Sequence, residues 1–177
     1  MSFLKRFFSS PDEPAMKTIV YRGGVVTFRI PAHWREEYSD FDGGTFYEDH
    51  PDSGTLRLKI ITMTTPEQSQ SGFAMGMLQV VVDRLRNEQQ VECTTKGRRD
   101  GNAVLMYEEA GSERGQSLTI FYWVVSNPLP PRHARAATFS YTILAEQRDS
   151  SQVQHDLEML EAEIEAATFW PEPWGCF

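Results

Sequence analysis

The side chains best suited to chemistry gather between positions 40 and 52. The group holds five carboxylates and one imidazole, which are Asp40, Asp42, Glu48, Asp49, Asp52 and His50. Such oxygen ligands suit a divalent cation, and Asp40-x-Asp42-Gly43 faintly resembles the start of a calcium-binding loop. The third regularly spaced acidic ligand and the terminal glutamate are missing, and the following residues predict a strand where an EF-hand needs a helix. We therefore interpret the group as two solvated turns and expect no metal site.

Catalytic signatures are missing from the rest of the sequence. His33, His133 and His155 are not spaced as a metal-binding pair, and no Gly-x-Ser-x-Gly nucleophile motif occurs. Cys93 has no adjacent basic residue that would activate its thiol, so we expect a buried structural cysteine. With Cys176 as the only other cysteine, a disulfide framework or thiol zinc site is not expected. The sequence predicts a protein that is not an enzyme and needs no cofactor.

Aromatic and basic side chains point instead to a binding surface. The stretch 169–177 is rich in phenylalanine and tryptophan beside two prolines. It either packs on the domain or forms an exposed docking peptide, and we favour packing because an exposed tail of this composition would promote aggregation. Two arginines before a predicted hairpin turn could meet an acidic partner, although a solvated hairpin tip explains them equally well. The candidate partner-binding residues are Trp170, Trp174, Phe177, Arg98 and Arg99.

The composition favours one folded, acidic domain. A chain of 177 residues with 40% hydrophobic residues can bury a substantial core without disulfides. Its formal net charge of -8 argues against nucleic acid as the main partner, because phosphate binding relies on lysine and arginine. The first 15 residues lack the apolar stretch of a signal peptide, and no later segment is long enough to span a bilayer. We therefore expect a reducing cytoplasmic location.

Hydrophobic periodicity predicts the strands and two helices. Thr65, Pro66 and Gln68 form a capping signal before the apolar run 73–85, which predicts the first helix. The second is predicted after the polar stretch 149–151, where Ser151 and Gln154 can form a capping box. Its apolar stripe consists of Val153, Leu157, Leu160, Ile164 and Ala167. Strands are predicted over residues 18–21, 25–30, 46–47, 55–63, 90–96, 103–107, 118–125 and 136–144.

This order of elements predicts an α+β fold. We expect a mostly antiparallel, twisted sheet of about six to seven strands with two main helices packed on it. The run 118–125 is apolar on both faces and is expected to be a central strand covered on both sides. The proline-rich stretch 127–131 is expected to be an exposed loop, and Trp34 a core anchor. The chain then divides into a flexible leader at 1–15, one domain at 16–168 and an aromatic tail at 169–177.

The sequence Val-Thr-Phe-Arg-Ile-Pro-Ala-His-Trp at positions 26–34 carries a family resemblance. Together with the element order and the closing amphipathic helix, it resembles the PsbP-like α/β/α sandwich. That superfamily includes photosystem II extrinsic subunits, a nuclear Ran-GTPase-binding protein and bacterial DcrB-like proteins, some of which are chaperones of secretion effectors. Over residues 16–168 the resemblance implies a binding scaffold more than an enzyme, and it transfers no partner because one fold serves unrelated functions.

Three functions are consistent with these features. The first is a non-enzymatic, adaptor-like or chaperone-like protein that holds a partner polypeptide of unknown identity on an exposed sheet face or in a groove between sheet and helix, using the aromatic residues of 121–123 and the tail. The second is a small-ligand binder or enzyme whose pocket is assembled from His33, Trp34, Glu48 and Tyr141. The third is a peripheral membrane protein that uses leader and tail together, which requires both chain ends on one side of the domain.

Overall fold

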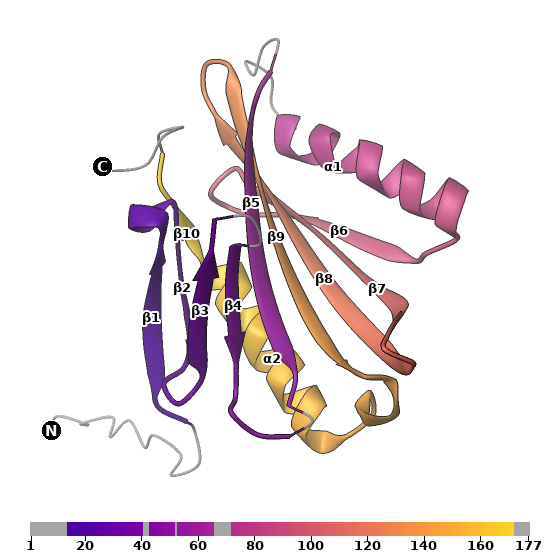
Figure 1. Ribbon diagram of the computed structural model, residues 1–177. Coiled ribbons are helices and arrows are strands. Elements are labelled where there is room, and N and C mark those ends of the chain that lie inside the picture. Colours follow the sequence, from indigo (N-terminus) through magenta and orange to yellow (C-terminus); the bar gives the residue numbers. More distant parts are fainter. Residues whose placement is uncertain (1–13, 41–42, 52, 66–71, 172–177) are drawn as a thin grey trace, which may run out of the picture.

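The computed structural model of this protein describes residues 14–40, 43–51, 53–65 and 72–171. These residues form two antiparallel sheets and two α-helices (Figure 1). The small sheet has the order β1-β2-β10, with β1 at Met16–Tyr21, β2 at Val26–Pro31 and β10 at Thr168–Phe169. The large sheet has the order β3-β4-β5-β9-β8-β7-β6, and its strands are β3 (Arg35–Ser39), β4 (Gly43–Tyr47), β5 (Thr55–Thr64), β6 (Cys93–Gly97), β7 (Ala103–Glu113), β8 (Gln116–Leu129) and β9 (His133–Leu144).

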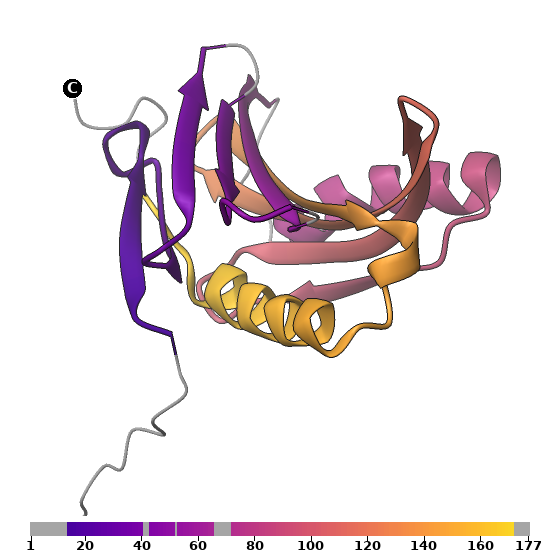
Figure 2. The ribbon, with the colours of Figure 1, turned by 60° about the horizontal axis from the view of Figure 1, so that its bottom comes forward.

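The helices α1 (Phe73–Arg84) and α2 (Ser151–Ala166) cover opposite faces of the large sheet. Neighbouring residues on β7 and β8 alternate between two cores: Leu105 and Val124 pack with α1, whereas Val104 and Trp123 belong to the core that contains α2. Figure 2 shows the large sheet curving around α2, with the small sheet beside that helix. Short helical turns at Arg22–Gly24 (η1), Leu85–Gln89 (η2) and Ala145–Gln147 (η3) connect these elements.

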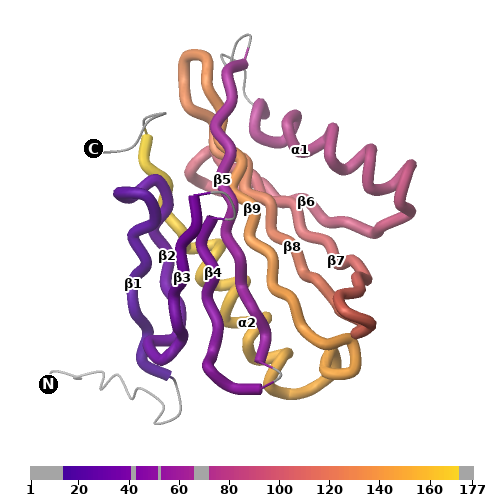
Figure 3. Tube along the Cα trace, in the orientation of Figure 1, coloured from indigo at the N-terminus to yellow at the C-terminus, as the bar shows by residue number. Residues whose placement is uncertain are grey.

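The main features of the predicted fold are confirmed. The structure is α+β, with a seven-stranded antiparallel sheet between two helices and a further three-stranded sheet. Trp34 is a buried member of the larger core, and the strand predicted at 118–125 contributes to both cores. Strands distant in sequence lie side by side at the centre, as Figure 3 shows for β5 and β9, which pair from Thr55 opposite Thr142 to Thr64 opposite His133.

The predicted loop at 127–131 is wrong over its first three residues. β8 continues through Asn127, Pro128 and Leu129, and Pro128 lies opposite Ala134 of β9. Beyond Ser126, β8 has β9 as its only neighbour among the described strands, so this end of the strand is an edge. A proline on an edge costs no ladder hydrogen bond when its nitrogen faces away from the paired strand. The buried Leu129 then fixes this end of the strand in the protein.

Three local features also differ from the predictions: one edge strand and the starts of both helices. The edge strand β3 was not predicted, because all of its residues are exposed and it has no buried apolar face. Helix α1 begins at Phe73 after Gly72, whose φ of 90° is left-handed, rather than at the capping signal near Thr65; Gln68 lies outside the described residues. The N-cap of α2 lies in the predicted stretch 149–151, but it is Ser150, whose hydroxyl accepts a hydrogen bond from the Val153 N–H, and not the Ser151 of the proposed capping box.

The described chain enters and leaves the small sheet at opposite ends. Met16 of β1 lies opposite Pro31, the last residue of β2, whereas Phe169 of β10 lies opposite Val26, the first. The membrane hypothesis requires leader and tail on one side of the domain, and this arrangement directs their attachment points apart. Among the described residues, no helix is long and apolar enough to cross a membrane.

Candidate functional site

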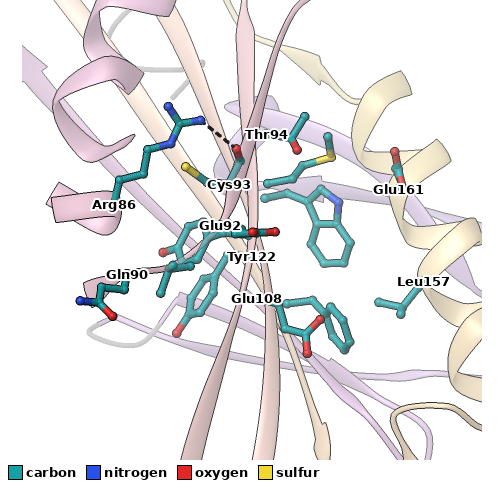
Figure 4. A pocket seen from close by; sticks show the side chains of 14 residues that line it. Arg86, Gln90, Glu92, Cys93, Thr94, Glu108, Tyr122, Leu157 and Glu161 are labelled. Atoms are coloured by element: carbon teal, nitrogen blue, oxygen red, sulfur yellow. Dashed lines mark hydrogen bonds between the residues drawn. The ribbon is translucent and has the colours of Figure 1, made fainter. Parts of the chain in front are cut away.

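An open groove of about 800 Å³ lies where β6 begins. Its walls come from η2, the start of β6, the middle of β7 and β8, and two residues of α2 (Figure 4). The sequence forms this groove because β6 is short: Cys93, its first residue, pairs with Tyr107, and β7 continues for six more residues to Glu113. The groove therefore lies beside the point at which β7 becomes the edge of the sheet.

Apolar side chains from both faces of the sheet line the groove. Met106, Phe121 and Leu157 are half-buried residues at the margin of the core that contains α2. On the other face, the rings of Tyr107 and Tyr122 stack with centroids 4.6 Å apart and planes inclined by 13°. The two cores of the protein thus meet here, and each leaves part of its apolar surface accessible around the same edge.

Backbone groups of β7 are open along this edge. From Glu108 to Glu113 the strand pairs with β8, and among the described residues no strand pairs with its other side. The β7–β8 turn has positive φ at Arg114 (49°) and Gly115 (83°), as a two-residue type I′ hairpin requires. Residues that flank such a turn exchange hydrogen bonds, and bonded and open positions alternate along the ladder. Ala110 and Ser112 therefore direct their N–H and C=O groups outward.

The rim of the groove is acidic. Three carboxylates, those of Glu92, Glu108 and Glu161, line it together with one guanidinium, that of Arg86. Arg86 donates a hydrogen bond of 3.3 Å to the carbonyl of Cys93, and Glu108 accepts two hydrogen bonds of 2.7 Å from Arg148, which lies outside the groove. Burial, and then the nearby carboxylate of Glu109, raises the pKa of Tyr107 to about 12. With Arg148 balancing Glu108, the lining keeps one more carboxylate than its guanidinium partners, so the groove is weakly acidic.

A smaller cavity brings together residues that the sequence analysis nominated for a ligand pocket. It has a volume of about 190 Å³, and Trp34, Glu48 and Tyr141 are among its lining residues. His33 is not in the lining, but its Nε2 lies 3.6 Å from Oε1 of Glu48. The cavity also contains Asp156, which the sequence analysis did not select.

The two candidate arginines occupy different environments. Arg98 donates hydrogen bonds to the carbonyls of Ile164 and Ala167 at the end of α2, and its side chain is only 9% exposed. It also pairs with Asp100 at 2.9 Å. A cation that binds the last carbonyls of a helix stabilises the helix terminus, so these contacts give Arg98 a structural role. Arg99 is exposed, and a role in partner binding stays a prediction for it.

The beginning of the aromatic tail packs on the domain. Phe169 pairs with Val26 in the small sheet, and the Trp170 N–H donates to the Val25 carbonyl at 3.2 Å. The carbonyl of Trp170 accepts a hydrogen bond of 3.0 Å from the buried Arg135. Trp174 and Phe177 lie outside the described residues. Trp170, Arg98 and Arg99, the three candidate partner-binding residues that the structure describes, do not line the large groove.

No protein-family model and no curated protein matches this sequence. Solved structures match the fold. LpqN of Mycobacterium tuberculosis, described as involved in cell envelope biogenesis, has a TM-score of 0.61 at 14% identity, over 89% of this chain and 91% of that chain. A point mutant of Mog1 has a TM-score of 0.50 at 12% identity, over 88% and 96% of the two chains.

The cyanobacterial PsbP protein of Synechocystis also matches, with a TM-score of 0.42 at 10% identity over 92% of this chain and 96% of that chain. At such identities the similarity concerns the fold and transfers no site. The resemblance proposed from the sequence is confirmed as a likeness of fold, which this chain shares with LpqN and Mog1.

Proposed function

We propose that this protein is a non-enzymatic polypeptide-binding domain that holds an extended segment of its partner against the open edge of β7. The observation that carries the proposal is the coincidence of an unpaired strand edge with a groove of about 800 Å³. An added strand gains affinity from main-chain hydrogen bonds, whereas its side chains, which alternate between the two faces, supply specificity.

Both faces of the added strand would meet apolar surface. Side chains directed toward α2 would reach Met106, Phe121 and Leu157, and those directed the other way would reach the stacked Tyr107 and Tyr122. Aromatic residues at the centre of a contact commonly dominate binding energy. An extended segment with apolar side chains at alternate positions fits this double-sided site better than a helix, which would use only one face.

The charge of the edge selects a basic partner. Glu109 and Glu113 lie on the open part of β7, in addition to the three carboxylates that line the groove. Like charges placed opposite each other destabilise a strand pair, so two copies of this edge repel, whereas lysine or arginine side chains on an added strand are attracted. A basic, partly aromatic polypeptide is therefore the expected ligand.

Fluorescence anisotropy with two labelled heptapeptides tests this function. One alternates lysine with phenylalanine, and the other alternates glutamate with phenylalanine. We expect the basic peptide to bind at least about tenfold more tightly, which corresponds to about 1.4 kcal/mol, and we expect its affinity to fall with added salt because exposed charges are screened.

A charge reversal in the groove tests the role of the carboxylates, and the same charge reversal on the opposite edge of the sheet is the matched control. Glu161→Lys should weaken binding of the basic peptide, whereas Asp40→Lys, an equal charge change at an exposed residue after β3 on the opposite edge of the sheet, should not. Equal affinity for the two peptides, or equal loss in the two variants, would contradict the proposal.

The cytoplasmic location expected from the sequence stays a prediction, which cell fractionation tests.

A further inference from the structure

The smaller cavity shares no lining residue with the β7 groove, and it differs from that groove in its chemistry. Its lining comes from Trp34, five residues between β4 and β5 that include Glu48 and His50 but not Asp49, Tyr141 of β9, Gln147 of η3, and the start of α2. At about 190 Å³ it is smaller than pockets for drug-sized ligands, which measure about 300–1,000 Å³. This volume limits an occupant to a short chain with one polar group.

Hydrogen-bond acceptors converge on this cavity. Asp156 accepts bonds of 2.7 Å from the Tyr141 hydroxyl and 2.9 Å from the Gln152 amide, so the carboxylate is held in a fixed orientation. Oε1 of Gln147 is buried and has no hydrogen-bond partner among the described residues. Glu48 contributes a second, half-exposed carboxylate to the lining. A buried oxygen without a donor is costly, and a ligand with several N–H donors would satisfy it.

Negative charge in the cavity is not balanced by lysine or arginine, because neither residue type lines it in the described part of the chain. His50 lies in the lining and His155 lies near Asp156. Burial, with a smaller contribution from the carboxylate of Glu48, raises the pKa of Asp156 above its ordinary value. A cation bound between the two carboxylates would reduce the repulsion between Asp156 and Glu48, and it would compensate Asp156 for its lost solvation.

The aromatic walls suit the same ligand. The rings of Trp34 and Tyr141 are nearly parallel, with centroids 6.3 Å apart and planes inclined by 8°. Aromatic faces attract cations, and their apolar surface accommodates an alkyl chain. Gly54 lets the loop approach Tyr141, because a Cβ there would overlap the tyrosine ring.

We propose that this cavity binds a protonated primary amine on a short alkyl chain. The ammonium group has three donors, which match Asp156, Glu48 and the Gln147 Oε1 atom, and the alkyl chain lies against the aromatic rings. The site is independent of the β7 groove, so either proposal can fail without the other.

Titration of the full chain with butylammonium chloride, followed by NMR, tests this site. We expect saturable chemical-shift changes at the Trp34 indole N–H and the Gln152 side-chain amide, and no saturable change with n-butanol, which has the same alkyl chain without the charge. A saturable response of similar size to butanol would show an apolar cavity with no amine site, and no response to either compound would overturn the proposal.

Variants locate the charge that is responsible. Asp156→Asn retains an oxygen acceptor for the Tyr141 hydroxyl and should raise the dissociation constant at least tenfold. Glu48→Gln changes a half-exposed side chain, and it should weaken binding several-fold even if Asp156→Asn does not fold. Glu161→Gln removes one carboxylate from the other groove and should leave amine binding unchanged. Equal affinities in all three variants would overturn the proposal.

Discussion

Replacing Arg135 by methionine is expected to lower the free energy of unfolding by about 3 kcal/mol or more. Arg135 lies on the central strand β9, and this charged residue is 0% exposed. Its Nη1 donates to the carbonyl of Trp170 at 3.0 Å, to Oδ1 of Asn127 at 3.1 Å and to the carbonyl of Val25 at 3.3 Å. Methionine fills similar space but removes the donor from Asn127 Oδ1 and the Trp170 carbonyl, at about 1–3 kcal/mol each, whereas the Val25 carbonyl keeps its bond from the Trp170 N–H.

The loss of stability in Arg135→Met should also involve neighbouring residues, because Arg135 belongs to a chain of polar contacts. Asn127 donates to Asn102 at 2.8 Å, and Asn102 donates to Asp100 at 2.8 Å. Through these contacts Arg135 connects the β6–β7 hairpin with the small sheet and the start of the tail. Removing one member of a buried network leaves its neighbours unsatisfied, so the loss exceeds that of an isolated hydrogen bond.

Urea denaturation of both Arg135→Met and Arg132→Met measures this difference. Arg132 is exposed in the β8–β9 turn, so the same substitution there should change stability by less than about 0.5 kcal/mol. Equal stability of the two variants would show that the buried guanidinium is not needed to hold these segments together.

A proline at position 110 should abolish most of the binding of the basic heptapeptide. Ala110 directs its N–H to the open side of β7, where an added strand would accept it. Ala110→Pro removes that donor and blocks close approach, so we expect affinity to fall at least about tenfold. Because the N–H does not belong to the β7–β8 ladder, the melting temperature should change by less than about 4 °C.

Ala110→Val is the control for a larger side chain at the same position. Valine keeps the N–H and favours an extended backbone, so peptide affinity should stay within about twofold of the original protein. If the proline variant binds as tightly as the valine variant, strand addition at this edge is ruled out, although binding by side chains alone would remain.

The fold was largely predictable because its elements have clear periodicity. Alternation identified β5 and β9, and a run that is apolar on both faces identified β8. The stripe of Val153, Leu160 and Ile164, which the structure buries, identified α2. The edge strand β3 could not be found this way, because a strand with no buried face has no alternation to detect. The end of β8 was not predicted, because a strand tolerates proline only where one side of the strand has no neighbour, and the sequence does not show which strands are neighbours.

The binding sites were predictable only in part. The aromatic residues of 121–123 were recognised as interface candidates, and Phe121 and Tyr122 do line the groove. The open edge was not predicted, because it arises from the lengths of β6 and β7, which alternation alone does not give. Arg98 was selected as an exposed cation, but its contacts with Ile164 and Ala167 depend on the tertiary position of α2.

The residues of the smaller cavity were also predictable only in part. Trp34, Glu48 and Tyr141 were grouped by their chemistry, and the structure brings them to one cavity. Asp156 was missed, although a carboxylate three residues after the buried Val153 lies at the margin of the apolar stripe of α2 and could have been noticed. Its pairing with Tyr141 requires the register between β9 and α2, which only the folded structure supplies.

Residue-resolved hydrogen exchange on the protein with and without the basic heptapeptide tests strand addition most directly. In the free protein, the amides of Glu109 and Gly111 should be protected by the β7–β8 ladder, whereas those of Ala110 and Ser112 should exchange rapidly. A saturating amount of the peptide should protect Ala110 and Ser112. If the peptide binds while these two amides still exchange at the rate of the free protein, the partner does not pair with β7 and the account is contradicted.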